Sequence, residues 1–509
     1  VAGGPLFLAE HEDFPEVDHF VLNEAEITLP LFLSDLERGE PKRLYTTTEF
    51  ADMEQSPLPL WELVDMRHYS SMCIQYSRGC PFACEFCNIT AMLGRRFRTK
   101  TAAQIIAELD TLYNLGWRHG VFFVDDNFIG NKRKLLPLIL TAIRTTQARC
   151  GTFLDLFAGS GVVSRLAKLS GFRVIANDWE PYCEVINRAY IEANSAPSFC
   201  RLGGLKATIL SLNLLPGRRG YIATHYCPAD DVHYDTSRER MFYTQFNGRR
   251  IDAIRETIKR WRDEGVIGDL EEAVLLAPLV YQASYCSNTS GVFKGFHNGW
   301  GGRTGTALYR IHSRLTLKPP IFFDNGLPNL VLREDAAEVA RRFECDIAYL
   351  DPPYNQHQYG SNYHLLNTIV LWDKPKISPC ISGNGARDKA GIRTDWRTLR
   401  RSAYCYRSTA LQAFGELVDT LRARFILTSY STDGIMPLDE MMRILSERGD
   451  LSVLVRRYKR YRVSSTRPSP RPHTVEFVAI VDTSRRSSPG QVDRAVEVIM
   501  QTEQRRLQF

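Results

Sequence analysis

Short apolar segments that end at polar or acidic residues alternate along the chain with stretches of helical periodicity. Residues 153–156 and 173–176 predict buried strands, and residues 161–170 predict the helix between them. The same pattern predicts later strands at residues 347–350, 424–428 and 474–481. This order of elements predicts an α/β fold built on a doubly wound sheet.

The part of the chain before residue 130 has a pattern of its own. Residues 74–78 and 120–124 predict strands on either side of a helix at residues 101–115. Further upstream, residues 20–22 predict a strand and residues 25–38 a helix. A separate β-α-β segment is therefore expected to precede the larger sheet.

Residues 195–320 interrupt the α/β order. They are rich in Arg, Tyr, Asn and Gly, and helical patterns occur at about 249–264 and 270–285. We therefore expect a helical insertion within the sheet. The predicted divisions of the chain are residues 1–70, 71–128, 129–194, 195–320, 321–485 and a C-terminal helix at 486–509.

The composition is that of a globular chain with more than one domain. It has 509 residues, of which 44% are hydrophobic and 24% charged. No apolar stretch reaches the ~20 residues that a membrane span needs, and the first residues do not resemble a signal peptide. They read as the interior of a domain. The cysteines form no disulfide-like framework, so we expect a cytoplasmic enzyme with reduced thiols and no membrane partner.

The net charge of +6 permits nucleic-acid binding but does not argue for it alone. The basic excess lies near the C-terminus, where tyrosines 458 and 461 are interleaved with it. Such a segment suits contacts to phosphates, and the alternative is a solvated face of a hairpin. Its basic residues are Arg456, Arg457, Lys459, Arg460, Arg462, Arg467 and Arg471.

A glycine turn with acids at two strand ends forms the first chemical motif. Gly159 and Gly161 follow the strand that carries Asp155, and Asp178 ends the next strand, 178 − 155 = 23 residues later. A glycine turn lets the backbone approach a cofactor, and an acid at the following strand end suits ribose hydroxyls. Taken alone, the turn has a purely structural alternative.

A second motif, Asp351-Pro352-Pro353-Tyr354, closes the apolar strand at residues 347–350. An acid and a neighbouring carbonyl can accept the protons of an exocyclic amine, and an aromatic ring can stack on the base that carries it. The alternative is a strand end closed by a proline turn. The sequence pattern favours the chemical interpretation, because it offers no local helix that Asp351 would cap.

Together the two motifs resemble those of the D12 class of DNA adenine N6-methyltransferases, over residues ~128–482. Residues 128–136 resemble motif X of that class, which precedes the glycine turn. The resemblance implies a Rossmann-like methyltransferase sheet, with residues 195–320 as the target-recognition insertion. It implies S-adenosylmethionine (SAM) as cofactor, bound by Gly130, Lys132, Asp155, Phe157, Gly159, Gly161, Asp178 and Asp335.

The same resemblance implies the chemistry of the second motif. An acidic first residue goes with adenine in this class, whereas Ser is more usual for cytosine N4. Asp351 and the Pro352 carbonyl would hold the N6 amine, Tyr354 would stack on the flipped base, and Pro353 would stiffen the loop. The implied partner is double-stranded DNA, with a cognate restriction endonuclease as a candidate. A monomer is the default expectation.

Cys80, Cys84 and Cys87 form a CxxxCxxC motif that resembles the signature of radical SAM enzymes. In that family the three thiolates hold a [4Fe–4S] cluster, and zinc is the alternative metal. Residues 1–70 resemble the tail of a cobalamin-binding domain. A barrel of that family needs about six β-α units, so two predicted strands leave edges uncovered. We expect a truncated fragment without chemistry of its own.

Residues 122–132 resemble cobalamin-type radical SAM proteins, and residues 129–136 resemble D12 enzymes equally well, so the two families share a short string here. We hypothesise that a recombined or misassembled reading frame joins the two there, which predicts few apolar contacts between residues 1–127 and 150–482. Two alternatives to the methyltransferase stay open. One is a radical SAM or cobalamin-dependent enzyme, and the other is an inactive DNA-binding chimera.

Overall fold

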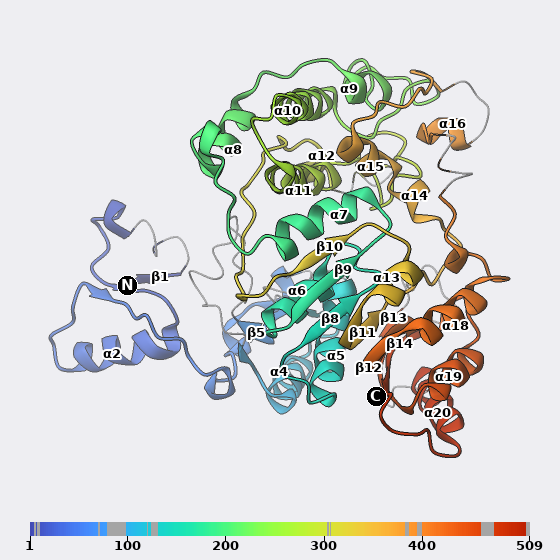
Figure 1. Cartoon of the computed structure of the whole chain (residues 1–509). Coiled ribbons are helices and arrows are strands. Elements are labelled where there is room, and N and C mark those ends of the chain that lie inside the picture. The colour runs from blue at the N-terminus through green and yellow to red at the C-terminus, as the bar shows by residue number, and fades with distance from the viewer. Residues whose placement is uncertain are drawn as a thin grey trace. The chain divides into compact units, whose positions relative to one another are not determined.

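The chain forms two compact units, Val1–Asn131 and Lys132–Phe509, in a computed structural model (Figure 1). Cys80, Cys84, Cys87 and Gly130 lie outside the residues that the structure describes. The described residues are 1–4, 7, 11–69, 72–78, 98–119, 121–123, 131–302, 305, 307–381, 386–393, 396, 400–459 and 473–504.

The first unit contains the predicted β-α-β segment. Strands β4 (Met72–Ile74) and β7 (Val121–Phe123) pair in parallel, and helix α4 (Ala102–Asn114) connects them in the chain. Thr101 begins α4 with a capping box, because its hydroxyl accepts from Gln104 N while the Gln104 side chain accepts from Thr101 N. The apolar cluster of this segment is small, with Met72, Ile74, Leu112 and Trp117 as its buried members.

A second small sheet lies upstream in the same unit. Its strands β1 (Ala2–Gly3), β2 (Phe20–Val21) and β3 (Leu44–Tyr45) are parallel, and helix α2 (Ala25–Glu37) follows β2. The predicted strand at 74–78 is divided, since residues 75 and 76 separate β4 from β5 (Ser77–Arg78).

Within the described residues of the second unit, seven strands form one mixed sheet in the order β10-β9-β8-β11-β12-β14-β13. Only β14 runs against its neighbours. Central strands β8 and β11 pair in parallel, and Thr152 N donates to Asp346 Oδ2 across 194 residues of chain. The bounds are β8 Thr152–Asp155, β9 Arg173–Asn177, β10 Leu330–Leu332, β11 Glu344–Leu350, β12 Arg422–Ser431, β13 Asp450–Lys459 and β14 His473–Asp482.

Helices cover both faces of this sheet (Figure 1). Ile347 and Tyr349 of β11 pack in a cluster with α5 (Asn131–Thr145) and α6 (Val162–Leu169). The alternate residues of β11, Ala348 and Leu350, pack in a cluster on the opposite face, as the two-residue period of a strand requires. The helices of that face are α13 Ala336–Arg342, α18 Ala410–Thr420, α19 Leu438–Glu447 and α20 Gln491–Gln504.

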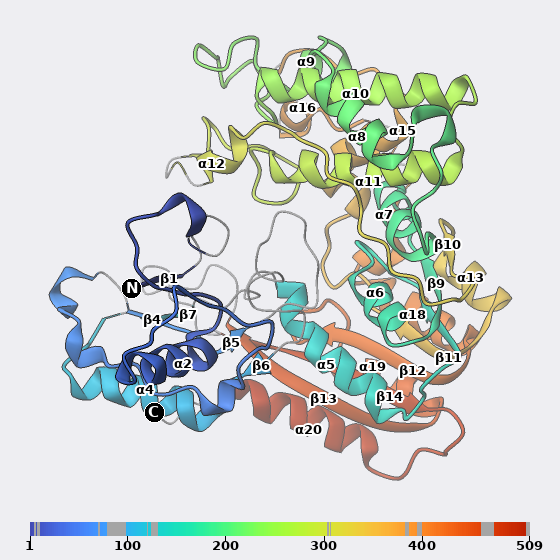
Figure 2. The same cartoon turned by 90° about the vertical axis from the view of Figure 1, so that its left-hand side faces the viewer.

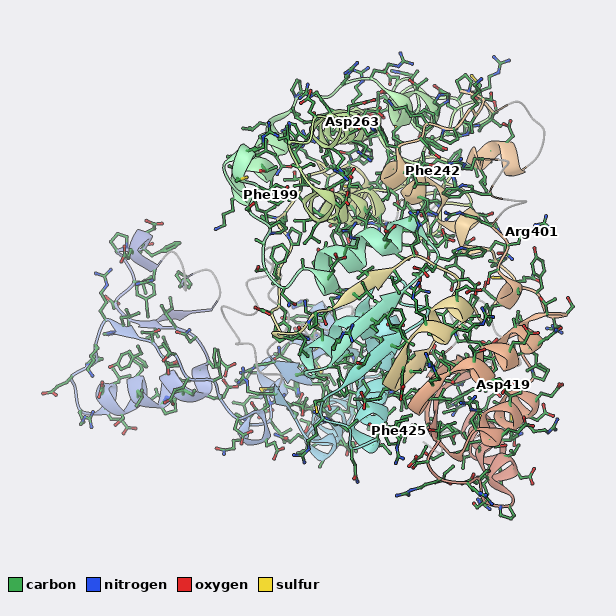
Figure 3. The ribbon with its side chains drawn as sticks, in the orientation of Figure 1. Phe199, Phe242, Asp263, Arg401, Asp419 and Phe425 are labelled. Carbon is green, nitrogen blue, oxygen red and sulfur yellow. The ribbon has the colours of Figure 1, made fainter. Side chains whose placement is uncertain are left out.

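The helical insertion lies beyond α7 (Pro181–Asn187), which separates it from the sheet in both Figure 1 and Figure 2. Its core joins α7 and α15 (His364–Leu371), and it contains buried Phe199 and Phe242 (Figure 3). The predicted helices at 249–264 and 270–285 are confirmed as α10 and α11. The bounds are α8 Leu205–Leu214, α9 Tyr221–His225, α10 Gln245–Asp263, α11 Asp269–Tyr285 and α12 Leu308–Ile311.

Two further elements of this unit concern the site and the basic segment. Helix α7 ends as an α-helix at Asn187, and the chain continues as a π-helical turn, Arg188–Glu192. The basic segment begins on a strand, β13, where Arg457 Nη2 lies 2.9 Å from His473 Nδ1. Residues 460–472 lie outside the described part of the chain. Among the helices that the structure describes, none has the length and apolar character for a membrane span.

Candidate active site

Three predicted acids lie at the carboxyl ends of neighbouring parallel strands. Asp155 ends β8, Asp178 follows β9 and Asp351 follows β11. This edge of a parallel sheet is where α/β proteins bind ligands, because loops diverge there and leave a crevice. A pocket at this edge is lined by Leu135, Ile139, Asp155, Phe157, Ala158, Ser160, Val162, Val163, Tyr349 and Asp351.

Asp155 is fully buried at the base of this pocket. Ser164 Oγ donates to its Oδ2 at 2.7 Å, while Oδ1 is buried and has no hydrogen-bond partner among the described residues. Burial, and then the charges of Asp351 and Asp178, raise the pKa of Asp155 to about 7. A buried carboxylate with one unused oxygen is a ready acceptor for a cationic group.

The glycine turn after β8 has a conformation that requires glycine. Gly159 and Gly161 have φ angles of 53° and 72°, which place both in the left-handed region. Asn187 Nδ2 donates to Gly159 O at 3.0 Å, and a Cβ at position 161 would overlap Asn187 Oδ1. Asn187 therefore supports the turn from α7, a role that the sequence did not reveal.

Asp178 is fastened by backbone amides. Its Oδ2 accepts from Gly159 N at 2.8 Å, and its Oδ1 accepts from Glu180 N at 2.9 Å. Glu180 is itself buried, and burial, followed by the charge of Asp178, raises its pKa to about 7. Hydrogen bonds through Asp178 thus join the glycine turn after β8 to the carboxyl end of β9.

Buried Asn177 joins this unit to the segment after β10. Its Nδ2 donates to Leu156 O and Glu334 O, and its Oδ1 accepts from Glu334 N at 3.0 Å. The predicted cofactor residue Asp335 follows directly and is the N-cap of α13, where it accepts from Ala337 N at 2.9 Å. The neighbouring β9 and β10 therefore bring Asp178 and Asp335 to the same edge.

The loop after β11 is more exposed than the glycine turn. Pro352 is buried, Asp351 and Pro353 are half-buried, and Tyr354 is 47% exposed. Within this loop His357 N donates to Asn355 Oδ1 at 2.9 Å. An exposed aromatic ring thus stands three residues from the acid that lines the pocket.

The remaining predicted positions are only partly described. Lys132 lies in the first turn of α5, and its side chain is outside the described atoms. Leu135 and Ile139 of the same helix line the pocket, so the predicted motif X segment leads to the site. Across the described residues no group of His, Cys, Asp and Glu is placed to hold a metal, and this does not include the three clustered cysteines.

Comparison with curated proteins gives one set of short matches. Hopanoid C-2 methylase of Rhodopseudomonas palustris is 39% identical over 141 residues, which are 27% of this chain and 27% of that protein.

The longer matches are to DNA methyltransferases. A family profile, D12 class N6 adenine-specific DNA methyltransferase, matches residues 128–379. Type II methyltransferase M.NlaIII of Neisseria lactamica is 33% identical over 343 residues, 67% of this chain and 93% of that protein. Type II methyltransferase M.FokI of Planomicrobium okeanokoites is 34% identical over 325 residues, 63% of this chain and 47% of that protein. The chain belongs to the D12 class of N6 adenine-specific DNA methyltransferases.

Proposed function

We propose that the pocket at the ends of β8 and β11 is the site at which this SAM-dependent DNA methyltransferase transfers a methyl group to adenine N6. The observation that carries the proposal is the convergence of Asp155, Phe157 and Asp351 on one pocket from distant parts of the chain. The parallel order β10-β9-β8-β11-β12, with helices on both faces, supports a Rossmann-like doubly wound arrangement for this part.

The cofactor side of the pocket has residues that fit SAM. The unused Oδ1 of Asp155 would accept the ammonium group, and Asp178 would accept from the ribose hydroxyls. Gly159 and Gly161 would let the backbone approach the methionine part. When bound, SAM supplies an electrophilic methyl group. We assign Gly130, Lys132, Phe157 and Asp335 to the same side.

The target side would hold the amine of an adenine that has left the duplex. Asp351 accepts one N6 hydrogen and the Pro352 carbonyl accepts the other, so electron density at N6 increases. Tyr354 stacks on the base, and Pro353 limits the motion of the loop. These groups act by position and by charge rather than through a covalent intermediate.

The insertion offers a surface for the DNA around the target base. Tyr309 and Phe246 are 78% and 51% exposed, the Arg310 guanidinium lies 5.8 Å from the Tyr285 ring, and that of Arg314 lies 5.9 Å from the Phe246 ring. Neither arginine forms an ion pair with a residue in the described part of the chain. Basic and aromatic side chains in alternation suit phosphates and bases.

Residues 1–128 are best explained as a fragment related to radical SAM methylases, with the parallel β4–β7 pair in support. We do not assign a reaction to this fragment, and Cys80, Cys84 and Cys87 are its candidate cluster ligands. We also propose the division of the chain into residues 1–70, 71–128, 129–194, 195–320, 321–485 and 486–509. A monomer and a cognate restriction endonuclease remain proposals about partners.

The first experiment is incubation of the whole chain with unmethylated duplex DNA and labelled SAM, followed by digestion and detection of N6-methyladenine. We expect product from the native chain and a loss of at least about a hundredfold in Asp351→Ala, since this removes the main acceptor for the amine. Asp419→Ala, an exposed position on α18 labelled in Figure 3, is the matched control. Full activity in Asp351→Ala would refute the assignment.

The DNA surface is tested separately by titrating labelled duplex at several salt concentrations. The double change Arg310→Ala/Arg314→Ala should reduce the slope of log affinity against log salt by about two, because each phosphate contact contributes about 0.9. Arg443→Ala, at an exposed position of α19, should leave the slope unchanged. An unchanged slope in the double variant would remove this surface from the interface.

A further inference from the structure

Gln358 lies immediately after the loop that carries Asp351–Tyr354, at the N-cap of the short helix α14 (Tyr359–Asn362). Its side chain does not cap that helix. Instead Ser402 N donates to Gln358 Oε1 at 2.8 Å, and Gln358 Nε2 donates to Ser402 O at 3.2 Å. The planar amide thus pairs with both backbone groups of one distant residue, which fixes the loop end in distance and in orientation.

The segment that receives Gln358 also reaches the cofactor side. A 3₁₀ turn at Ala403–Cys405 follows Ser402, and Cys405 Sγ donates to His357 O at 3.5 Å. The Tyr404 ring meets the Phe157 ring edge-on, with centroids 5.2 Å apart. Phe157 lines the pocket beside Asp155. A continuous path therefore runs from the target-side loop, through Ser402–Tyr404, to the wall of the cofactor pocket.

The other side of α14 is held by the insertion. Phe293 N donates to Asn362 O at 2.6 Å, and His364 Nε2 lies 2.9 Å from Phe293 O. Asn362 N in turn donates to Gln358 O at 3.1 Å. The end of the loop after β11 is thus bonded on one side to the segment at Ser402 and on the other to Phe293 of the insertion. Gln358 supplies the side-chain hydrogen bonds to Ser402.

We propose that Gln358 is a positioning residue for methyl transfer, which sets the distance and angle between the Asp351–Tyr354 loop and the bound methyl donor. The proposal rests on the proposed function of that loop. Gln358 does not itself need to touch either substrate. Because reacting atoms must be aligned within a fraction of an ångström, release of the loop would slow the chemical step while both substrates still bind.

The test measures the single-turnover rate constant on duplex DNA, with separate dissociation constants for SAM and DNA. Gln358→Ala and Gln358→Met should each lower the rate constant about 10- to 100-fold, because both delete the two bonds to Ser402. Both dissociation constants should stay within about twofold of the native values. Gln412→Ala, which removes an exposed glutamine that bonds to Glu416 on α18, should change none of the three.

A second variant breaks the same contact from its other end. Ser402 has φ −73° and ψ 127°, which proline accepts, and Ser402→Pro removes the amide that donates to Gln358. It should lower the rate constant, and Gln358→Ala combined with it should be no slower than the slower single variant. Independent multiplication of the two losses would contradict a shared contact.

Three outcomes would overturn the inference. A rate constant within about twofold of the native value in Gln358→Ala means that the contact does not position the loop. Parallel losses of SAM affinity, DNA affinity and melting temperature mean that Gln358 only stabilises the fold. If Asp351→Ala retains activity, the proposed function fails first, whereas an inactive Asp351→Ala beside a fully active Gln358→Ala refutes the inference alone.

Discussion

The proposed cofactor side and the proposed target side of the pocket lie at one sheet edge but are built differently. On the cofactor side Asp155 is buried, and Asp178 is held by two backbone amides. On the target side Tyr354 is 47% exposed at the end of a proline loop. A small cofactor can be received by a preformed site, whereas a base that leaves a duplex needs an open one. Under the proposed assignment, the rigid part of this edge therefore ends where the DNA base would enter.

Among these changes, Asp155→Asn on the proposed cofactor side should have the largest effect, a loss of SAM affinity. The amide keeps an acceptor for Ser164 but loses the charge, so SAM affinity should fall about 100-fold, in the range of a charge-assisted hydrogen bond. Isothermal titration with SAM measures the loss. DNA affinity without cofactor should not change, and a parallel loss of DNA binding would contradict the division into two sides.

At alkaline pH the Asp155→Asn variant should be more stable than the native chain. Burial and two neighbouring acids raise the folded-state pKa of Asp155 from 3.8 to about 7, so the folded chain retains a proton that the unfolded chain releases. The native free energy of unfolding therefore decreases as pH rises from about 4 to 7. Asn removes this contribution, so denaturant melts at pH 8 should show a gain in stability on the order of 4 kcal/mol, which disappears near pH 4.

Tyr354→Ala on the proposed target side should have an intermediate effect, a loss of methylation rate on duplex DNA. Loss of one stacking ring costs about 1–3 kcal/mol, so the rate on duplex DNA should fall about tenfold or more. Tyr354→Phe keeps the ring and should remain close to native. SAM affinity and melting temperature should be unaffected by either change, because the side chain is half exposed. Tyr406→Ala, another exposed tyrosine of this unit, is the control.

Gly161→Ala should have the smallest effect on SAM affinity, and it tests how rigid the glycine turn on the proposed cofactor side is. An alanine there would be strained at φ 72° and would also overlap Asn187 Oδ1. Gly265 has φ 64° with no atom within 4 Å of an added Cβ, so Gly265→Ala contains the strain alone. Both variants should lose about 1 kcal/mol of stability to the strained backbone. Gly161→Ala should lose more than Gly265→Ala because Asn187 must shift, and only Gly161→Ala should also lose SAM affinity, by about threefold. Equal SAM affinities would show that the turn tolerates the overlap.

The strands that end in acids could be predicted from the sequence because each signal is local. The apolar segments that precede Asp155 and Asp351 were both predicted as strands, and they proved to be neighbouring strands that lead to these acids. The long helices α10 and α11 were also predictable, since their periodicity extends over several turns. By contrast β10 has only three residues, and the basic end of β13 suited a phosphate-binding segment as well as a solvated face of a hairpin.

The supporting residues of the site could not be predicted. Asn177 bonds to Glu334 across 157 residues, and Gln358 to Ser402 across 44, so neither pair leaves a periodic trace in the sequence. Asn187 looks like an ordinary polar residue near the end of a helix. Their roles arise only when the sheet brings distant loops together, which is the part of the fold that local patterns do not specify.

The pairing of β8 with β11 also has a consequence for synthesis. Ribosomes add about 5–20 residues per second, so the 194 residues between Thr152 and Asp346 separate the two strands by about 10–40 s. During that interval one edge of β8 lacks its native neighbour, and the insertion lacks α15, whose residues are part of its core. The last strands to emerge, β12 to β14, then complete a sheet whose middle was left open. Slower growth at low temperature, or a holding chaperone, should therefore raise the yield of active enzyme more than it would for a chain with only local pairings.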